Sequence, residues 1–222
     1  MVLGPSEYNF DLLVENSTVA TTDTLRILGV TLDRKLTFKE QIFEQTKKAC
    51  AKAAALKRIR KFIPLDVRSR LYKAYILPHL EYCSPLMLGI TDGLINKLEN
   101  TNYHILKSVL GFCGSTSYEY LLNLVGISTL KKRREYHALL MVYKSINNLG
   151  PSYLQELFKL KTVNYNLRGS GTLLEMPRFN LEFCHRSFRY LGAQLWNTLP
   201  TKIREAEDFP SFKLLLRKHV GM

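Results

Sequence analysis

Apolar residues recur at helical spacing through most of the chain, and the clearest case is the segment 39–63. At about 100° per residue, one side of this segment gathers apolar residues, namely Ile42, Ala49, Ala53, Leu56 and Ile63. Pro64 ends the pattern, because proline does not continue a helix, and a second helical pattern covers 65–77. The spacing therefore predicts two consecutive amphipathic helices.

Five further helices are predicted from spacing and from capping residues. A Ser or Thr side chain at a helix start accepts a free backbone N–H, and Gly after the last turn favours a stop. These signals place helices at 91–110, 117–125, 129–148, 181–195 and 212–219, the third capped by Ser128 or Thr129 and the last by Ser211. The stretch 136–146 is apolar nearly all round, so we expect it to be buried.

Strand-forming residues concentrate in the first 36 positions. Short runs at 8–14, 18–20 and 25–32 predict strands, the last of them bent at Gly29. Two or three strands alone bury little apolar surface, so these resemble the edge of a larger sheet. The expected fold class is mainly α, a helical bundle with a small N-terminal antiparallel β element (α+β).

The side of segment 39–63 that lies opposite the apolar residues is cationic. It carries Lys47, Ala51, Ala54, Arg58 and Lys61. The only acidic residue between Lys47 and Lys73 is Asp66, whereas a helix face that serves solubility alone usually mixes Glu with Lys. Two interpretations stay open: an ordinary solvated face, and a face that binds a nucleic-acid backbone with alanines that permit close approach.

A second cationic cluster stands at the start of the predicted helix 129–148. It consists of Lys131, Lys132, Arg133 and Arg134. Cations at this end oppose the helix dipole unless an anion lies nearby. The alternative is that these long side chains extend over a core helix and keep only their charges in water.

Composition narrows the class of partner. The chain has 222 residues, a net charge of +13 and a pI near 9.6, which favours an anionic partner and, among these, nucleic acid. No apolar run of about 18 residues is present, and the N-terminus does not look like a signal peptide. We therefore expect the nucleus or cytoplasm, with no membrane partner and no secretion.

The metal-ligating residue types are dispersed. The four cysteines, Cys50, Cys83, Cys113 and Cys184, form no CxxC pair, so free buried thiols are expected rather than a zinc site. The five histidines are spread along the chain, and each is expected to be structural or exposed rather than catalytic. We expect no metal site.

Several segments, taken together and in order, resemble one known family. Residues 28–38 (LGVTLDRKLTF) are similar to the segment that closes the palm of reverse transcriptases from jockey-like non-LTR retrotransposons. Residues 71–85 (LYKAYILPHLEYCSP), Arg133-Arg134-Glu135, Tyr143-Lys144, Arg186-Ser187-Phe188, 195–200 (LWNTLP) and 209–213 (FPSFK) follow in the same order. The resemblance covers nearly the whole chain from Leu25 and implies the end of the palm, the thumb and the tail beyond it.

This resemblance implies four parts and a binding function. Residues 1–36 would be a β remnant of the palm, 37–160 a thumb-like bundle, 161–180 a linker and 181–222 a helical tail. Leu28, Gly29 and Val30 resemble the primer grip, whose backbone touches the primer end. The expected partner is RNA or DNA as a primer–template duplex, together with the parent polymerase's palm and fingers. The residues expected to hold the nucleic-acid backbone are Lys47, Lys48, Lys57, Arg58, Lys61, Arg68, Arg70, Lys131, Lys132, Arg133 and Arg134.

The chemistry of the complete family is not expected of this chain. Nucleotidyl transfer uses two Mg²⁺ held by paired carboxylates, which the family supplies from a Tyr-x-Asp-Asp turn and an upstream Asp. Neither is present, and the aspartates are scattered. We expect no catalytic residue and no cofactor, since Mg²⁺ belongs to the complete enzyme. The hypotheses left open are a binding fragment, a polymerase completed by a palm supplied in trans, and a relic or co-opted helical interaction protein.

Overall fold

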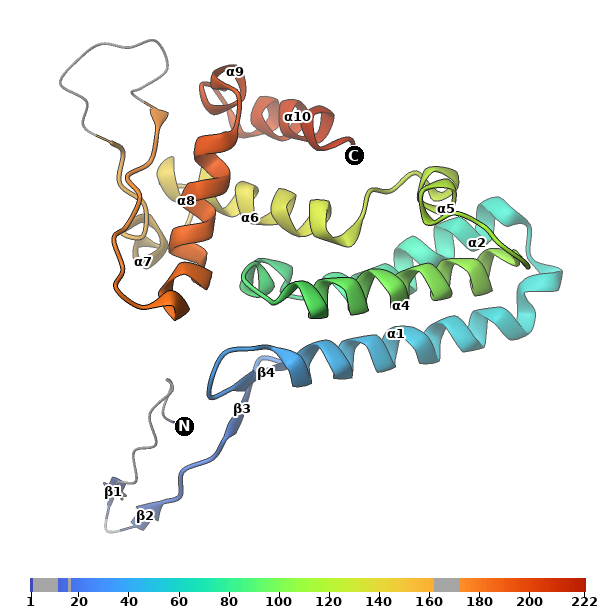
Figure 1. The fold of residues 1–222 in the computed structure, drawn as a ribbon, viewed down its shortest axis with the longest axis horizontal. Helices are drawn as coiled ribbons and strands as arrows, with labels where there is room; N and C mark the ends of the chain where they lie inside the picture. Colours follow the sequence, from blue (N-terminus) through green and yellow to red (C-terminus); the bar gives the residue numbers. More distant parts are fainter. Residues whose placement is uncertain (2–11, 16, 162–171) are drawn as a thin grey trace. The chain divides into compact units, whose positions relative to one another are not determined.

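The chain folds into two compact units. The computed structural model describes residues 1, 12–15, 17–161 and 172–222 (Figure 1). Unit 1 comprises Met1–Tyr82 and Ile90–Gly111, and unit 2 comprises Cys83–Gly89 and Phe112–Met222. Both are built mainly of helices, and the strands near the N-terminus are short and antiparallel. The predicted mainly α fold with a small β element is confirmed.

The strands form two separate hairpins in unit 1. Strand β1 (Leu12–Val14) pairs with β2 (Ser17–Val19), and β3 (Thr24–Ile27) pairs with β4 (Val30–Asp33). The single strand predicted at 25–32 is therefore wrong. Leu28 and Gly29 both have positive φ, 48° and 79°, and two such residues reverse the chain with the twist that a hairpin needs. Most of the strand predicted at 8–14 lies outside the described residues.

The helices of unit 1 follow the predicted pattern with two departures: the helix predicted at 39–63 ends in a 3₁₀ segment, and the one predicted at 65–77 contains a π turn and continues to Glu81. They are α1 (Lys39–Ile59), the 3₁₀ segment η1 (Arg60–Phe62), α2 (Leu65–Leu71), the π-helical segment η2 (Tyr72–Ile76), α3 (Leu77–Glu81) and α4 (Asp92–Leu110). The wider π turn, in which the Leu77 N–H donates to the Tyr72 carbonyl, immediately precedes Pro78. Proline has no N–H for the helical ladder and crowds the carbonyl four residues before it, so a local change of turn is expected there.

The core of unit 1 lies between α1, α4 and the segment from η2 to α3. The predicted apolar side of α1 is buried at Ile42, Ala49, Ala53 and Leu56, while Ile63 beyond its end is half-buried. A polar pair lies inside this largely aliphatic core. The Tyr72 hydroxyl donates to Asn102 Oδ1 at 2.6 Å, and both side chains are fully buried. The pair is mutually satisfied, which keeps the cost of burying it low.

Unit 2 begins with a 3₁₀ turn and continues as helices. Its elements are η3 (Ser84–Met87), α5 (Tyr118–Val125), α6 (Leu130–Ile146), α7 (Ser152–Gln155), η5 (Glu182–Arg186), α8 (Phe188–Thr198), α9 (Thr201–Arg204) and α10 (Phe209–Val220). Ser117 and Thr129 cap α5 and α6, as two of the predicted starts require. The last helix starts earlier than predicted, because the Asp208 carboxylate accepts the Ser211 N–H at 2.7 Å. Asp208, not Ser211, is therefore its cap.

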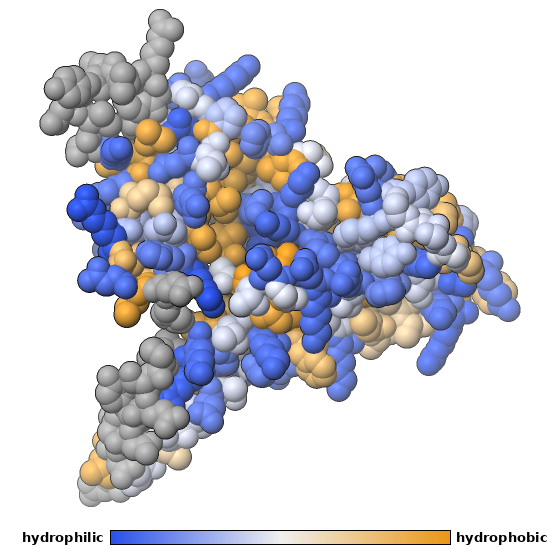
Figure 2. Space-filling model, in the orientation of Figure 1, coloured by the Kyte–Doolittle hydropathy of each residue, from blue (hydrophilic) through white to orange (hydrophobic). Residues whose placement is uncertain are grey.

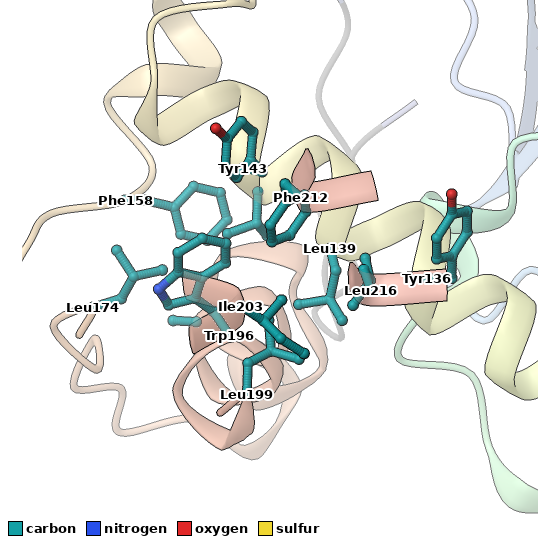
Figure 3. Close-up of a cluster of buried hydrophobic side chains, with 12 residues drawn as sticks. Tyr136, Leu139, Tyr143, Phe158, Leu174, Trp196, Leu199, Ile203, Phe212 and Leu216 are labelled. Atoms are coloured by element: carbon teal, nitrogen blue, oxygen red, sulfur yellow. The ribbon is translucent and has the colours of Figure 1, made fainter. Parts of the chain in front are cut away.

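The core of unit 2 is aromatic and draws on segments far apart in sequence. Figure 3 shows Tyr143 from α6, Phe158, Trp196 from α8 and Phe212 from α10 meeting in one cluster. The rings of Tyr143 and Phe212 stack at 4.2 Å between centroids. Helix α6 thus packs against α8 and α10. The chain passes from one unit to the other at residues 82/83, 89/90 and 111/112. Half of the predicted linker 161–180, namely 162–171, lies outside the described residues.

Two expectations about single features can be compared with the structure. All four cysteines are free, but Cys50 and Cys113 are exposed while Cys83 and Cys184 are half-buried, so the expected burial is wrong. Cys83, Cys113 and Cys184 lie in turns, a loop or a 3₁₀ segment rather than on the buried side of a long helix. Across the described part of the chain, no helix has both the length and the apolar run that crossing a bilayer would require.

Candidate nucleic-acid interface

The start of α1 is fixed by the β3–β4 hairpin. The Thr31 N–H donates to Gln41 Oε1 at 2.9 Å, and both residues are buried. The Asp33 carboxylate accepts the N–H groups of Thr37 at 2.9 Å and Phe38 at 2.7 Å. These bonds satisfy backbone groups that a helix start leaves free, although Phe38 itself has φ 59° and supplies no side-chain cap. These bonds therefore fix the start of α1, about two turns before the cationic face begins at Lys47.

The cationic face of α1 is defined as Lys47 and Arg58, with Ala51 and Ala54 between them, together with Lys61 in the adjoining 3₁₀ segment η1. It is exposed along its whole length. This confirms the predicted orientation of the helix. Within the described residues, no ion pair involves a lysine or arginine of α1. Figure 2 shows hydrophilic side chains projecting from the edge that α1 forms in unit 1, with apolar residues between them. The charges are therefore accessible to a ligand in solvent.

Three more cations of α1 widen this surface. Lys48 and Lys57 are exposed on its two flanks, in agreement with the sequence analysis. Lys52 is exposed as well and was missed. It lies about 140° around the helix from Lys47, close to the buried side, so periodicity alone gave no reason to include it. The exposed fraction of a flank residue depends on how closely the neighbouring helix approaches.

A shallow groove runs beside the cationic face. Its volume is about 420 Å³, and α1 and α4 form its two walls. Helix α1 contributes Cys50, Ala53, Ala54 and Lys57, and α4 contributes Thr101, His104, Ile105 and Ser108. Alanines keep the α1 wall low, and Lys57 links the groove to the cations. A ligand on the cationic face thus meets a mostly apolar surface on this flank.

Two arginines of unit 1 are occupied at the end of α4. Arg60 Nη1 donates to the Ser108 carbonyl, and Arg68 Nη1 donates to the Leu110 carbonyl, each at 2.5 Å. A Cβ added to Gly111 would lie 3.0 Å from Arg68 Nη1, so this turn is packed around the guanidinium. Helix C-termini carry free carbonyls and partial negative charge. Arg68, one of the expected binding residues, is thereby explained as a structural contact.

Arg70 is exposed but forms a local ion pair. Its Nη2 lies 2.5 Å from Asp66 Oδ2 one helical turn earlier, with both side chains more than half exposed. The hydrogen bond from Arg70 lowers the pKa of the Asp66 carboxyl below its usual value. An exposed pair of this kind contributes little to stability, so Arg70 stays accessible with part of its charge compensated.

The primer-grip-like turn is well anchored. Leu28 is 90% exposed at the tip of the β3–β4 hairpin, whereas Val30 is buried. The Tyr82 hydroxyl donates to the Leu28 carbonyl at 2.6 Å, and the Tyr82 ring also lies against Gly29. One turn carbonyl is therefore engaged by the end of α3, while the Leu28 side chain points into solvent.

The cationic cluster of unit 2 is only partly on the surface. Lys131 and Lys132 are exposed, Arg133 is half-buried and Arg134 is buried, at 3% exposure. Arg134 therefore does not present its charge to a partner, which departs from its place in the expected binding set. Burial raises the pKa of the adjacent Glu135, and the charges of Lys131, Arg134 and Lys132 oppose that rise. The cluster thus includes a nearby carboxyl group as well as solvent-facing lysines.

Four of the five aspartates that the structure describes, all except Asp23, have a local role. Asp33 holds the connection into α1, Asp66 pairs with Arg70, Asp92 lies in the first turn of α4, and Asp208 caps α10. Among the described residues, no group of three His, Cys, Asp or Glu side chains could hold a metal ion. Carboxylates near helix N-termini are favoured by the helix dipole, which accounts for several of these positions.

Comparison with known proteins adds no relative to this geometry. No protein-family model, no curated protein and no solved structure matches the chain.

Proposed function

We propose that unit 1 binds the sugar–phosphate backbone of a nucleic-acid duplex through the cationic face of α1, without regard to sequence. The observation that supports this most is the exposed row Lys47, Arg58 and Lys61, which has alanines between the cations and no carboxylate from Gln45 to Leu65. Lysine and arginine contacts to phosphates supply most of the affinity in sequence-independent binding.

The dimensions of α1 suit a polyanion rather than a single phosphate. From Lys47 to Lys61 the helix axis advances by about 21 Å, at about 1.5 Å per residue. The cations in this distance therefore face several successive phosphates of a duplex, and the small alanine side chains let the backbone come close. The groove toward α4 would receive a sugar edge on one flank.

The proposal has a wider form that rests on the sequence resemblance. The chain would be the palm end, thumb and tail of a jockey-like non-LTR reverse transcriptase, acting as a binding part rather than as the catalytic part. The β3–β4 turn at Leu28 and Gly29 would then lie near the primer end. A role on genomic or element nucleic acid places the protein in the nucleus or cytoplasm.

The test is a salt titration of duplex binding. The triple variant Lys47→Gln/Arg58→Gln/Lys61→Gln should flatten the slope of log affinity against log salt by about two to three units, since each lost phosphate contact removes about 0.9. Affinity for unrelated duplex sequences should fall together, because no base is read. A filter-binding or anisotropy titration from low to moderate salt measures both.

The matched control removes the same charge elsewhere. Lys202, Lys213 and Lys218 are exposed on α9 and α10 of unit 2, so Lys202→Gln/Lys213→Gln/Lys218→Gln changes the net charge equally. The control should leave most of the slope in place. Equal slopes for the wild-type chain and the α1 variant would refute the proposal, as would equal losses in the two triple variants.

A further inference from the structure

Unit 2 contains a wall of chain that two cavities share. The wall is residues 175–179, and the cavities have volumes of about 750 Å³ and 400 Å³. Both volumes lie in the range of small-molecule sites. Nothing in the proposed duplex binding uses this region, because the cationic face of α1 belongs to unit 1.

The segment that leads into the wall is held from two sides. Asn197 binds Leu174 twice, accepting its N–H at 2.8 Å and donating to its carbonyl at 2.9 Å. Trp196 Nε1 donates to the Thr172 carbonyl at 2.8 Å. On the other side, the Glu175 N–H donates to the Lys159 carbonyl at 2.8 Å. The Trp-Asn pair of the LWNTLP segment thus fixes the base of this wall from the aromatic core.

Three rings stand together beside the larger cavity. Phe179, His185 and Tyr190 all line it, and the ring centroids of His185 and Tyr190 are 4.7 Å apart. Phe179 lies 6.3 Å from His185 and 6.4 Å from Tyr190. All three side chains are half-buried, so each ring is supported by the protein and still partly open.

Helix α8 gives one of these rings, Tyr190, a rigid base. Ser187 caps the helix by accepting the Tyr190 N–H at 3.3 Å. A Cβ added to Gly192 would lie 3.0 Å from the Val142 side chain and 3.1 Å from the Phe158 ring. The helix therefore docks directly on α6 and Phe158, which fixes the direction in which Tyr190 leaves it.

The charges around the two cavities are nearly all positive. Lys161 and Arg178 line the larger cavity, while Lys159, Arg178 and Arg189 line the smaller one. Among the residues that line either cavity, the one carboxylate is Glu175. Arg178 and Phe179 belong to both cavities, so a ligand in either meets a cation beside a ring. This combination matches a flat, uncharged group linked to phosphate.

We propose that this pair of cavities binds unpaired nucleotides of a single-stranded nucleic acid. A base stacks on the Phe179–His185–Tyr190 group, and the phosphates on either side of it contact Arg178 and the neighbouring lysines. Aromatic platforms with cationic surroundings bind single strands in this way, with little preference for the base. Two adjoining cavities that share Arg178 and Phe179, each with a further cation of its own, fit successive nucleotides of a strand better than one free nucleotide.

The test separates base stacking from simple charge. Binding is measured by fluorescence anisotropy on the full chain carrying Lys47→Gln/Arg58→Gln/Lys61→Gln, so that α1 contributes little. The probes are a labelled 12-nucleotide oligothymidylate and an abasic oligonucleotide with the same number of phosphates. The oligothymidylate should bind about tenfold more tightly, an effect within the range of base–aromatic stacking. Equal affinity for the two probes overturns the proposal, and this comparison needs no substitution in unit 2.

Substitutions then assign the effect to the rings. Tyr190→Leu should remove most of the preference for the base-bearing probe, while Tyr190→Phe keeps the ring and should restore it. Tyr153 is exposed in α7 of the same unit, so Tyr153→Leu is the matched control and should change nothing. Arg178→Gln should weaken both probes alike. If Tyr190→Phe loses the preference as fully as Tyr190→Leu, or if Tyr153→Leu does so, stacking at this site is ruled out.

Competitors decide the source of the ligand. Thymidine monophosphate should displace the oligothymidylate only at far higher concentration, because it offers one phosphate instead of several. If thymidine monophosphate displaces the labelled strand at a concentration similar to that of unlabelled oligothymidylate, the site binds a free nucleotide and the proposal of a single strand is wrong. Displacement by a phosphotyrosine peptide would overturn nucleic acid altogether. These outcomes do not depend on α1, whose own test is the salt slope of duplex binding.

Discussion

The two units present positive charge in different ways. In unit 1 the cations stand in a row on a long helix, with alanines between them and a shallow groove alongside. In unit 2 they surround cavities lined by Phe179, His185 and Tyr190. A row on a helix responds to the spacing of phosphates, whereas a cavity with rings also responds to the group attached to the phosphate. Net charge alone therefore does not define what a basic protein binds.

The hydrophobic cores that support these two surfaces also differ. The core of unit 1 is largely aliphatic and holds one buried Tyr72–Asn102 hydrogen bond. The core of unit 2 is built on Trp196, Tyr143 and Phe212, whose rings lie within 6.4 Å of one another. Aromatic rings bury large areas and prefer defined geometries. In unit 2 this rigid aromatic cluster holds the segment that begins at Thr172, which has little regular structure of its own, through the hydrogen bond from Trp196.

The largest expected effect is the loss of that aromatic anchor. Trp196→Ala should lower the free energy of unfolding of unit 2 by about 3–5 kcal/mol, as buried Trp to Ala changes do. It also leaves the Thr172 carbonyl without its N–H donor. Trp196 is the only tryptophan of the chain, so urea unfolding is followed by circular dichroism rather than by its fluorescence.

This variant also probes the independence of the two units. Duplex binding by the cationic face of α1 should persist in Trp196→Ala, because none of those residues belongs to unit 2. Trp196→Phe keeps a ring in the core and should be less destabilising than Trp196→Ala. If duplex binding is lost in parallel with the unfolding of unit 2, the two surfaces are not independent of each other.

An intermediate effect is expected inside unit 1, where Arg68 and Lys61 should behave in opposite ways. Arg68→Gln should reduce stability by about 1–2 kcal/mol, because a charged hydrogen bond to the end of α4 is lost. It should leave the salt slope of duplex binding unchanged. Lys61→Gln should flatten the slope by about one unit and leave stability within about 0.5 kcal/mol.

Arg70→Gln, at an exposed pair, is the control for Arg68 in thermal unfolding. A flattened slope in Arg68→Gln would return this residue to the binding surface.

The smallest effect concerns pH and the start of α10. The hydrogen bonds that Asp208 accepts from Ser211 lower the pKa of its carboxyl below the usual value of 3.8. A lowered pKa in the folded state stabilises the fold above the unfolded pKa, and this stabilisation is lost as pH falls through the folded value. The thermal midpoint of unit 2 should therefore fall below about pH 4 more steeply in the wild-type chain than in Asp208→Asn.

Comparing these two chains isolates the carboxyl group. Asparagine still caps a helix, so the geometry of the α10 start is kept. Glu135, whose pKa burial raises, acts in the opposite direction but is common to both chains and cancels. Parallel curves of midpoint against pH from 2 to 6 would show that Asp208 contributes no pH dependence.

Local sequence signals predicted much of the helical structure. Periodicity placed the cations of α1 on the exposed side and Ile42, Ala49 and Leu56 on the buried side. Ser117 and Thr129 marked two helix starts. These features are set within a few residues, by side-chain direction along a helix and by unsatisfied N–H groups. The same signals misplaced the start of α10. Asp208, two residues before Pro210, and Ser211, one residue after it, were both possible caps, and the structure uses Asp208.

The sequence by itself determined that a helix with a cationic face free of acidic residues exists. The spacing of the cations and the lack of acidic residues are local features, because they do not depend on contacts with another segment. Tertiary structure decided which cations remain available. Arg68 is turned to the carbonyls at the end of α4, and Arg134 is buried although Lys131 beside it in the cluster is exposed. It also brought Arg178, Phe179 and Tyr190 to one wall through the bonds of Trp196 and Asn197. The physical reason is that contacts between residues tens of positions apart depend on how helices pack, and no local pattern encodes that packing.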